Sequence, residues 1–248
     1  MRKGSPVAQP LPDSEVERVL VVTAHPDDCD FGASGTLATW SALGIAITLC
    51  VITDGDAGGF DPDVPRSDIP RIRRIEQQAA AALWGAEEVV FLGYRDGELT
   101  VSHDLRRDIS RVIRQVRPRR MLIQSPERNW ERIQASHPDH LAAGEAAIQA
   151  VYPDARNPFA HTALLADEGL DAWTVEEVWV MAGPQPDHAI DITDTFATKL
   201  AALRAHESQT AHMDDLEPLL RDWGGRIAER FGLAEGRLAE AFQVVKTG

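Results

Sequence analysis

The sequence has 248 residues, of which 44% are hydrophobic and 26% charged, as is usual for a folded soluble protein. Its formal net charge of −14 argues against nucleic acid and against anionic membranes as main partners, since both favour clusters of lysine and arginine. Two cysteines, Cys29 and Cys50, form no CxxC pair and are too few for a disulfide framework. We therefore expect a reduced, cytoplasmic setting.

The N-terminal segment contains no secretory signal, and no stretch reaches the roughly 18 apolar residues that a membrane span needs. We therefore expect no membrane insertion. Residues 1–14 are rich in proline and polar types, which predicts a flexible arm. No repeat or long linker divides the rest, so residues 15–248 are expected to form a single domain.

Short apolar, β-branched runs predict buried strands, and longer patterns closed by glycine or proline predict helices. In chain order the pattern gives strand 19–23, helix 35–43, strand 45–53, loop 54–70, helix 71–84, strand 88–92, helix 104–116, strand 120–124, loop 125–136 and helix 141–151. Weaker patterns indicate a strand at 175–181 and helices at 194–207 and 223–231. This alternation predicts an α/β domain with a mostly parallel sheet and helices on both faces.

Titratable side chains follow each of the first four predicted strands. Ligands in an open parallel sheet bind at the carboxyl ends of the strands, so these side chains are expected to meet at one edge. The set comprises His25, Asp27, Asp28, Asp54, Asp56, Asp96, His137, Asp139 and His140. We interpret this edge as the functional site.

Two imidazoles and a carboxylate suit a divalent ion such as Zn²⁺, and three protein ligands leave a fourth position open for water. His25, Asp28 and His140 are the candidate ligands. The alternative is that His25 only packs and Asp28 only caps a helix. Two similar motifs, HPDD and HPDH, at the ends of two strands favour the metal site.

The neighbouring residues have candidate catalytic roles. Asp27 adjoins Asp28, so one carboxylate can bind the metal while the other acts as general base on the water. His137 could bind the metal or stabilise an oxyanion. Asp139 could accept a hydrogen bond from an imidazole and fix its tautomer. Spacing alone does not choose between these roles.

The same motifs resemble those of the PIG-L/LmbE-type deacetylases. Residues 24–28 (AHPDD) with Gly32 and Gly35 resemble the first family motif, and residues 137–140 (HPDH) resemble the second. Softer similarities occur at residues 53–59, at Arg73 and Glu76, at residues 91–97, and at Lys199 with residues 205–209. The resemblance covers about residues 19–210.

This resemblance implies a Rossmann-like fold and a zinc ion held by His25, Asp28 and His140. It implies that Asp27 is the general base and that His137 stabilises the oxyanion. Asp139 would orient His137.

Arg73 and Asp96 fall where family members contact sugar hydroxyls, and Asp54 is assigned to substrate binding with them. Where some members carry a tyrosine that polarises the carbonyl, this sequence has Ala135.

The expected activity is zinc-dependent removal of an N-acetyl group from an amino sugar or an N-acetylglucosamine-containing glycoside. One alternative is an amidase acting on a thiol conjugate or another acyl-amide natural product. A second is a non-catalytic sugar-binding protein with the same fold. The expected partner is a small N-acetylated glycoside, with no nucleic acid. The sequence does not determine the oligomeric state, so a homo-oligomer is possible.

Overall fold

The computed structural model describes residues 9–248. Its centre is a seven-stranded sheet in the order β3-β2-β1-β4-β5-β7-β6. The strands are β1 Arg18–Thr23, β2 Ala46–Thr53, β3 Glu88–Tyr94, β4 Arg120–Gln124, β5 Glu177–Met181, β6 His188–Asp191 and β7 Ala239–Lys246. The first five strands in this order, β3, β2, β1, β4 and β5, run parallel to one another. Strand β7 is antiparallel to both of its neighbours, β5 and β6. The predicted single α/β domain with a mostly parallel sheet is confirmed.

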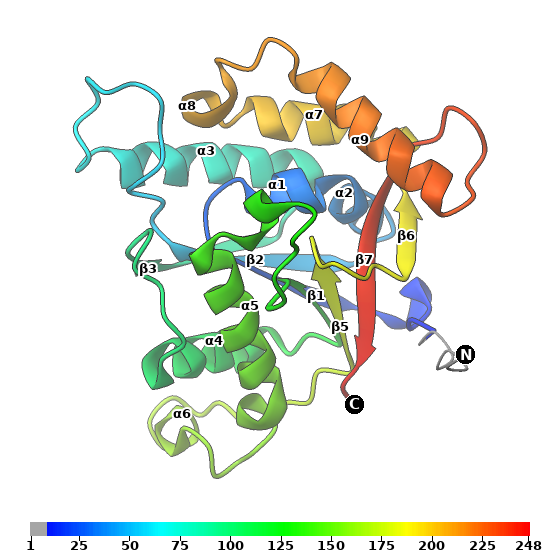
Figure 1. Cartoon of the computed structure of the whole chain (residues 1–248). Coiled ribbons are helices and arrows are strands. Elements are labelled where there is room, and N and C mark those ends of the chain that lie inside the picture. Colours follow the sequence, from blue (N-terminus) through cyan, green and yellow to red (C-terminus); the bar gives the residue numbers. More distant parts are fainter. Residues whose placement is uncertain (1–8) are drawn as a thin grey trace.

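Nine α-helices occur in the described part of the chain and lie on the two faces of the sheet (Figure 1). Helices α1, α2, α3, α7, α8 and α9 lie on one side, and α4, α5 and α6 on the other. Their bounds are α1 Asp28–Gly32, α2 Ser34–Ala42, α3 Ile69–Trp84, α4 His103–Val116, α5 Pro138–Gln149, α6 Thr162–Ala166, α7 Phe196–Arg204, α8 Glu207–Thr210 and α9 Leu216–Arg230. None of them is long and apolar enough to cross a membrane.

Side chains of each central strand alternate between two apolar layers. Leu20 and Val22 of β1 pack in the layer beneath α4 and α5, whereas Val19 and Val21 pack in the layer beneath α2 and α3. This alternation follows from the two-residue period of a strand and explains why the runs are apolar throughout. A third, smaller apolar cluster joins α7 and α9 to the end of the sheet.

Several segments differ from the sequence prediction. Strands β6 and β7, the short helices α6 and α8, and the π-helical turn Ala150–Ala155 were not predicted. Of the predicted flexible arm, residues 1–8 lie outside the described residues. Leu11 is attached to the sheet, because its N–H donates to Glu177 Oε2 at 2.7 Å and its carbonyl accepts from Arg120. A 3-10 turn, Asp13–Glu15, then leads into β1.

The parallel strands bring four loops together at the carboxyl edge of the sheet. The loop after β1 leads directly into α1, and the loop after β2, residues 54–68, meets the loop after β3, residues 95–99. The loop after β4 leads through the 3-10 turn Ile133–Ser136 into α5. Helix α5 lies against the end of β4. A side chain at Gly144 would place its Cβ 2.3 Å from the Gln124 carbonyl oxygen, so glycine permits this close approach.

Candidate active site

Three side chains converge where β1 and β4 end. The His25 Nδ1 and His140 Nε2 atoms are 3.2 Å apart, and His140 Nε2 lies 3.0 Å from Asp28 Oδ1. His25 Nδ1 lies 3.4 Å from Asp28 Oδ2. Zinc–nitrogen and zinc–oxygen bonds of about 2.0–2.1 Å in a tetrahedral site separate neighbouring donor atoms by roughly 3.3 Å. The three side chains therefore bring donor atoms together at spacings that suit a metal ion, and His137 lies close enough to His25 and His140 to be a further candidate ligand.

Without an ion, attraction between the imidazoles and the Asp28 carboxylate holds the triad together. Burial would lower the pKa of His25, but attraction to Asp28 and hydrogen bonds to Asp139, Asp28 and Asp96 raise it to about 12. Burial would raise the pKa of Asp28, but His140 and His25 hold it well below its usual range. The carboxylate thus stays ionised, and a dication would replace the imidazole protons as its counter-charge.

The second ring nitrogen of His25 is held by two carboxylates. His25 Nε2 lies 3.1 Å from Asp139 Oδ2 and 3.2 Å from Asp96 Oδ1. Asp139 is fully buried and accepts hydrogen bonds from the backbone N–H groups of Gly97 and Leu99. This arrangement places the proton of a neutral His25 on Nε2 and leaves Nδ1 free to bind a metal.

The expected pairing of Asp139 with His137 is therefore not the one observed, because the Asp139 carboxylate contacts His25. His137 is linked to Asp139 only through the backbone: its Nδ1 accepts the Asp139 N–H at 3.2 Å. Burial and the nearby imidazoles of His25 and His140 lower the pKa of His137. In a neutral ring whose Nδ1 accepts, Nε2 carries the proton and can donate.

Asp27 lies beside the triad in a strained backbone conformation. Its φ of 86° falls in the left-handed region, which a non-glycine residue rarely adopts. Helix α3 holds it at two points. Gln77 Oε1 accepts the Asp27 N–H at 2.8 Å, and Arg73 Nη2 donates to Asp27 Oδ2 at 3.1 Å. Burial raises the pKa of Asp27 to about 6 despite the attraction of Arg73.

The three predicted substrate-binding residues are already occupied by protein contacts. Arg73 is only 3% exposed and also donates to the carbonyl oxygens of Pro26 and Gly55. Asp96 contacts His25 and accepts the Ala57 N–H. Asp54 accepts from Arg74. The structure thus places Arg73 and Asp96 as supports of Asp27 and His25, which differs from the expected sugar contacts.

A buried network behind Asp27 was not predicted from the sequence. Asp30 accepts hydrogen bonds from Gln77, Trp84 and His206, at 2.8, 2.8 and 2.9 Å. Gln77 therefore joins Asp30 to the Asp27 backbone. A signal was available, since Gln77 follows Arg73 by one helical turn and so shares its face of α3.

Ala135, at the position where some family members carry a tyrosine, contributes through its backbone. Its carbonyl oxygen lies 3.4 Å from His140 Nδ1, which leaves His140 Nε2 directed at the triad. Its methyl side chain offers no hydrogen-bonding group.

Similarity to known proteins identifies the family of this chain. The chain is 32% identical to the diacetylchitobiose deacetylase of Thermococcus kodakarensis, over 94% of this chain and 85% of that protein. It is 33% identical to the Bacillus cereus protein named Probable N-acetyl-alpha-D-glucosaminyl L-malate deacetylase 2, over 86% of this chain and 90% of that protein.

A solved structure, the N,N'-diacetylchitobiose deacetylase from Pyrococcus horikoshii complexed with its inhibitor MPG, superposes with a TM-score of 0.86. It is 31% identical, and the match covers 95% of this chain and 86% of that chain. Residues 20–151, which contain the whole triad, match the family described as PIG-L: GlcNAc-PI de-N-acetylase. The chain belongs to the PIG-L de-N-acetylase family.

Proposed function

We propose that this protein is a zinc-dependent hydrolase that removes the N-acetyl group from an amino sugar or an N-acetylglucosamine-containing glycoside. One observation carries the proposal: donor atoms of three side chains that can bind a metal lie 3.0–3.4 Å apart beside Asp27, a carboxylate whose pKa is raised by burial to about 6. The similarity to deacetylases of N-acetylated sugars supports the substrate class.

His25, Asp28 and His140 would hold the ion. A zinc ion bound there would supply a Lewis acid that polarises the acetamide carbonyl and lowers the pKa of a nearby water. Asp27 is suited to remove a proton from that water, because a base with a pKa of about 6 is mostly ionised at neutral pH yet still basic.

His137 would act on the other side of the carbonyl group. Its Nε2–H can donate to the oxygen that becomes negative when water adds to the acetamide carbon. Asp27, protonated in the first step, then gives its proton to the amine as the C–N bond breaks. The products are acetate and the free amino sugar, so water is the only co-reactant.

Asp139, Asp96 and Gln77 are assigned positioning roles. Asp139 and Asp96 fix the ring of His25, and Gln77 fixes the backbone of Asp27. None of the three needs to contact the substrate to affect turnover.

The test is acetate release from N-acetylglucosamine and N,N'-diacetylchitobiose by zinc-loaded protein, with the chelator-treated protein as control. We expect acetate and free amine in equal amounts, and only from the zinc-loaded sample. Folded, zinc-containing protein that releases no acetate from any N-acetylated amino sugar would contradict the proposal.

A further inference from the structure

A cavity of about 170 Å³ lies between α9, the start of β7 and the loop that precedes α5. Aromatic and aliphatic side chains form much of its wall, including Phe31, Trp223, Ile227 and Phe231. An apolar cavity of about 150 Å³ can hold one benzene ring. This cavity is therefore large enough for a single six-membered ring.

The cavity shares two of its walls with the predicted metal site. Phe31 and Gly32 lie on α1, which begins at the metal ligand Asp28, so they are about 6 Å or less from it along the helix axis. On another wall, the Asn129 N–H donates to Ser136 Oγ at 2.8 Å, directly before His137. The cavity and the triad are thus built on the same two segments, although no side chain of the triad lines the cavity.

Two arginines at the cavity have no acidic partner. Arg132 and Arg230 both line it, and neither has a carboxylate within 4.0 Å among residues 9–248. The Arg132 guanidinium carbon lies 4.1 Å from the centroid of the Trp223 ring. Stacking on an aromatic face holds a guanidinium in one plane while its N–H donors stay available.

The other charges at the cavity do not neutralise these arginines. Lys199 is already used, because its ammonium group pairs with Glu240 at 2.7 Å and donates to the Asp30 and Phe31 carbonyls. Glu131 is the one further acidic residue in the lining. The lining thus carries a net charge of +1, from Arg132, Arg230 and Lys199 against Glu131 and Glu240, in a chain whose net charge is −14.

We propose that this cavity binds a carboxylate-bearing ring in the part of the substrate beyond the N-acetylated sugar, an inference that rests on the proposed deacetylase function. The apolar walls accept the ring, and the planar donors of Arg132 and Arg230 match the carboxylate. The substrate is then an N-acetylglucosamine glycoside with an acidic aglycone. The aglycone is either an aromatic acid or a uronic acid, and its ring occupies the cavity.

A matched pair of substrates tests the charge preference. The 4-carboxyphenyl and 4-carbamoylphenyl N-acetyl-β-glucosaminides differ only in charge at the far end of the ring. For zinc-loaded wild-type protein we expect kcat/KM to favour the acid by on the order of tenfold, through a lower KM. The ratio should fall towards one in Arg132→Gln and Arg230→Gln.

Arg128→Gln is the matched control. Arg128 lies on the same loop as Arg132 and 5.5 Å from the ring of Trp130, but it does not line the cavity. This variant should keep the wild-type ratio. Acetate release from both glycosides with a wild-type ratio near one would overturn the inference while the deacetylase function stands.

Binding without turnover separates the two proposals. Zinc-loaded wild-type protein, Arg128→Gln and the double variant Arg132→Gln/Arg230→Gln are titrated by calorimetry with benzoate and with glucuronate. Binding that is lost only in the double variant supports the cavity, and the probe that binds identifies the ring. Binding that persists in the double variant would take place at the metal ion and would overturn the inference. The absence of any binding to wild-type protein would overturn it as well. If neither these glycosides nor any other N-acetylated amino sugar is hydrolysed, the deacetylase proposal falls and this titration still decides the cavity.

Discussion

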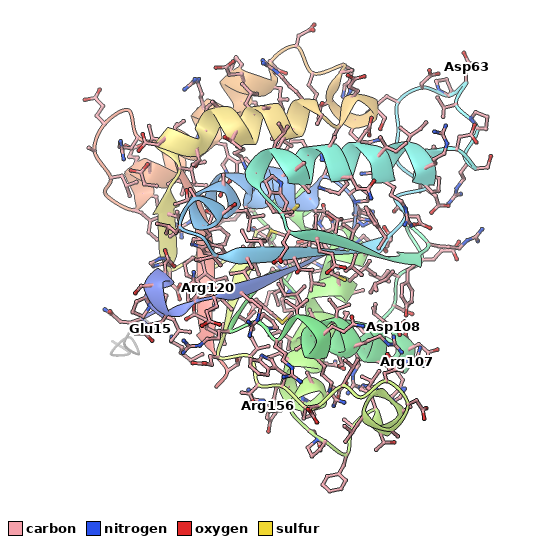
Figure 2. All side chains as sticks on the ribbon, turned by 180° about the vertical axis from the view of Figure 1, so that it is seen from behind. Glu15, Asp63, Arg107, Asp108, Arg120 and Arg156 are labelled. Carbon is pink, nitrogen blue, oxygen red and sulfur yellow. The ribbon has the colours of Figure 1, made fainter. Side chains whose placement is uncertain are left out.

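Two buried clusters of charged residues lie at opposite edges of the same sheet, and their charge balance differs. At the amino edge, Arg120 pairs with Glu177 at 2.7 Å and with Asp13 at 2.6 Å, and Lys246 also pairs with Glu177. The Arg120 guanidinium lies 4.6 Å from the ring centroids of both Trp40 and Trp179. Figure 2 shows Arg120 at this edge, near Glu15. Two cations thus face two anions.

At the carboxyl edge the permanent charges do not balance. Four carboxylates, those of Asp27, Asp28, Asp96 and Asp139, face one permanent cation, the guanidinium of Arg73, and the remaining positive charge comes from protons on His25 and His140, which a metal ion would displace. An excess of shielded negative charge is costly unless a cation compensates it. The comparison indicates that the balanced cluster stabilises the fold, whereas the unbalanced cluster carries a negative charge that the proposed dication would compensate.

The largest expected effect is at the unbalanced cluster. Asp27→Asn keeps the shape of the side chain but removes the base, so turnover should fall on the order of a hundredfold or more. Zinc content should stay near wild type, because Asp27 is not one of the three ligands. Acetate release and elemental analysis check both. Asp63→Asn, on the exposed loop before α3 (Figure 2), is the control and should be fully active. Full activity of Asp27→Asn would show that the base is another group.

A substitution in the balanced cluster should lower the free energy of unfolding and leave the deacetylase activity unchanged. Glu177→Gln leaves Arg120 buried beside a neutral partner, which should cost about 3 kcal/mol of unfolding free energy. Denaturant unfolding measures this change. Zinc content and kcat of the folded variant should match the wild type. A loss of zinc would contradict the separation of the two clusters.

The pH dependence of stability should also separate the clusters. Burial would raise the pKa of Glu177, but hydrogen bonds from Lys246, Leu11, Trp179 and Arg120 lower it. A carboxyl whose folded pKa is lowered stabilises the protein above its unfolded pKa of about 4.5, and this contribution is lost as the pH falls through the folded pKa. The stability difference between wild type and Glu177→Gln should therefore narrow below about pH 4.5. Unfolding curves at pH 7 and pH 3.5 test this, and an unchanged difference would exclude an ionised Glu177 as its source.

A smaller effect on kcat is expected for residues that hold the unbalanced cluster in position. Gln77→Ala removes the acceptor of the Asp27 N–H and should lower kcat about tenfold, with zinc retained, because the strained backbone at Asp27 loses a support. Its neighbour Gln78 is exposed on the same helix, so Gln78→Ala is the matched control. Equal kcat values in both variants would remove Gln77 from the positioning network.

The sequence predicted the parallel part of the fold because its strands are buried on both faces and therefore apolar throughout. Strand β4 was predicted with the observed bounds, Arg120–Gln124. Strands β6 and β7 were missed because they lie at the antiparallel end of the sheet. Partly exposed residues occur all along β6 and alternate with buried ones in β7, so neither forms a continuous apolar run.

The site was predicted in its composition but not in all of its contacts. The HPDD and HPDH motifs do bring His25, Asp28 and His140 together. The partners of Arg73 and Asp139 depend on how α3 and the loop after β3 pack against the motifs, and local spacing carries no information on that packing. For the same reason the sequence did not single out Asp30, and it gave no partner for Gln77, on the Arg73 face of its helix, or for His206, within the similarity at residues 205–209.

Metal content tests the central claim most directly. Elemental analysis is made on wild type, His140→Ala and Glu177→Gln after incubation with zinc and removal of the unbound ion, with circular dichroism confirming the fold of each. We predict close to one zinc per chain in wild type and Glu177→Gln, and a large loss in His140→Ala. Folded wild-type protein that retains no zinc would contradict the assignment of the unbalanced cluster as a metal site.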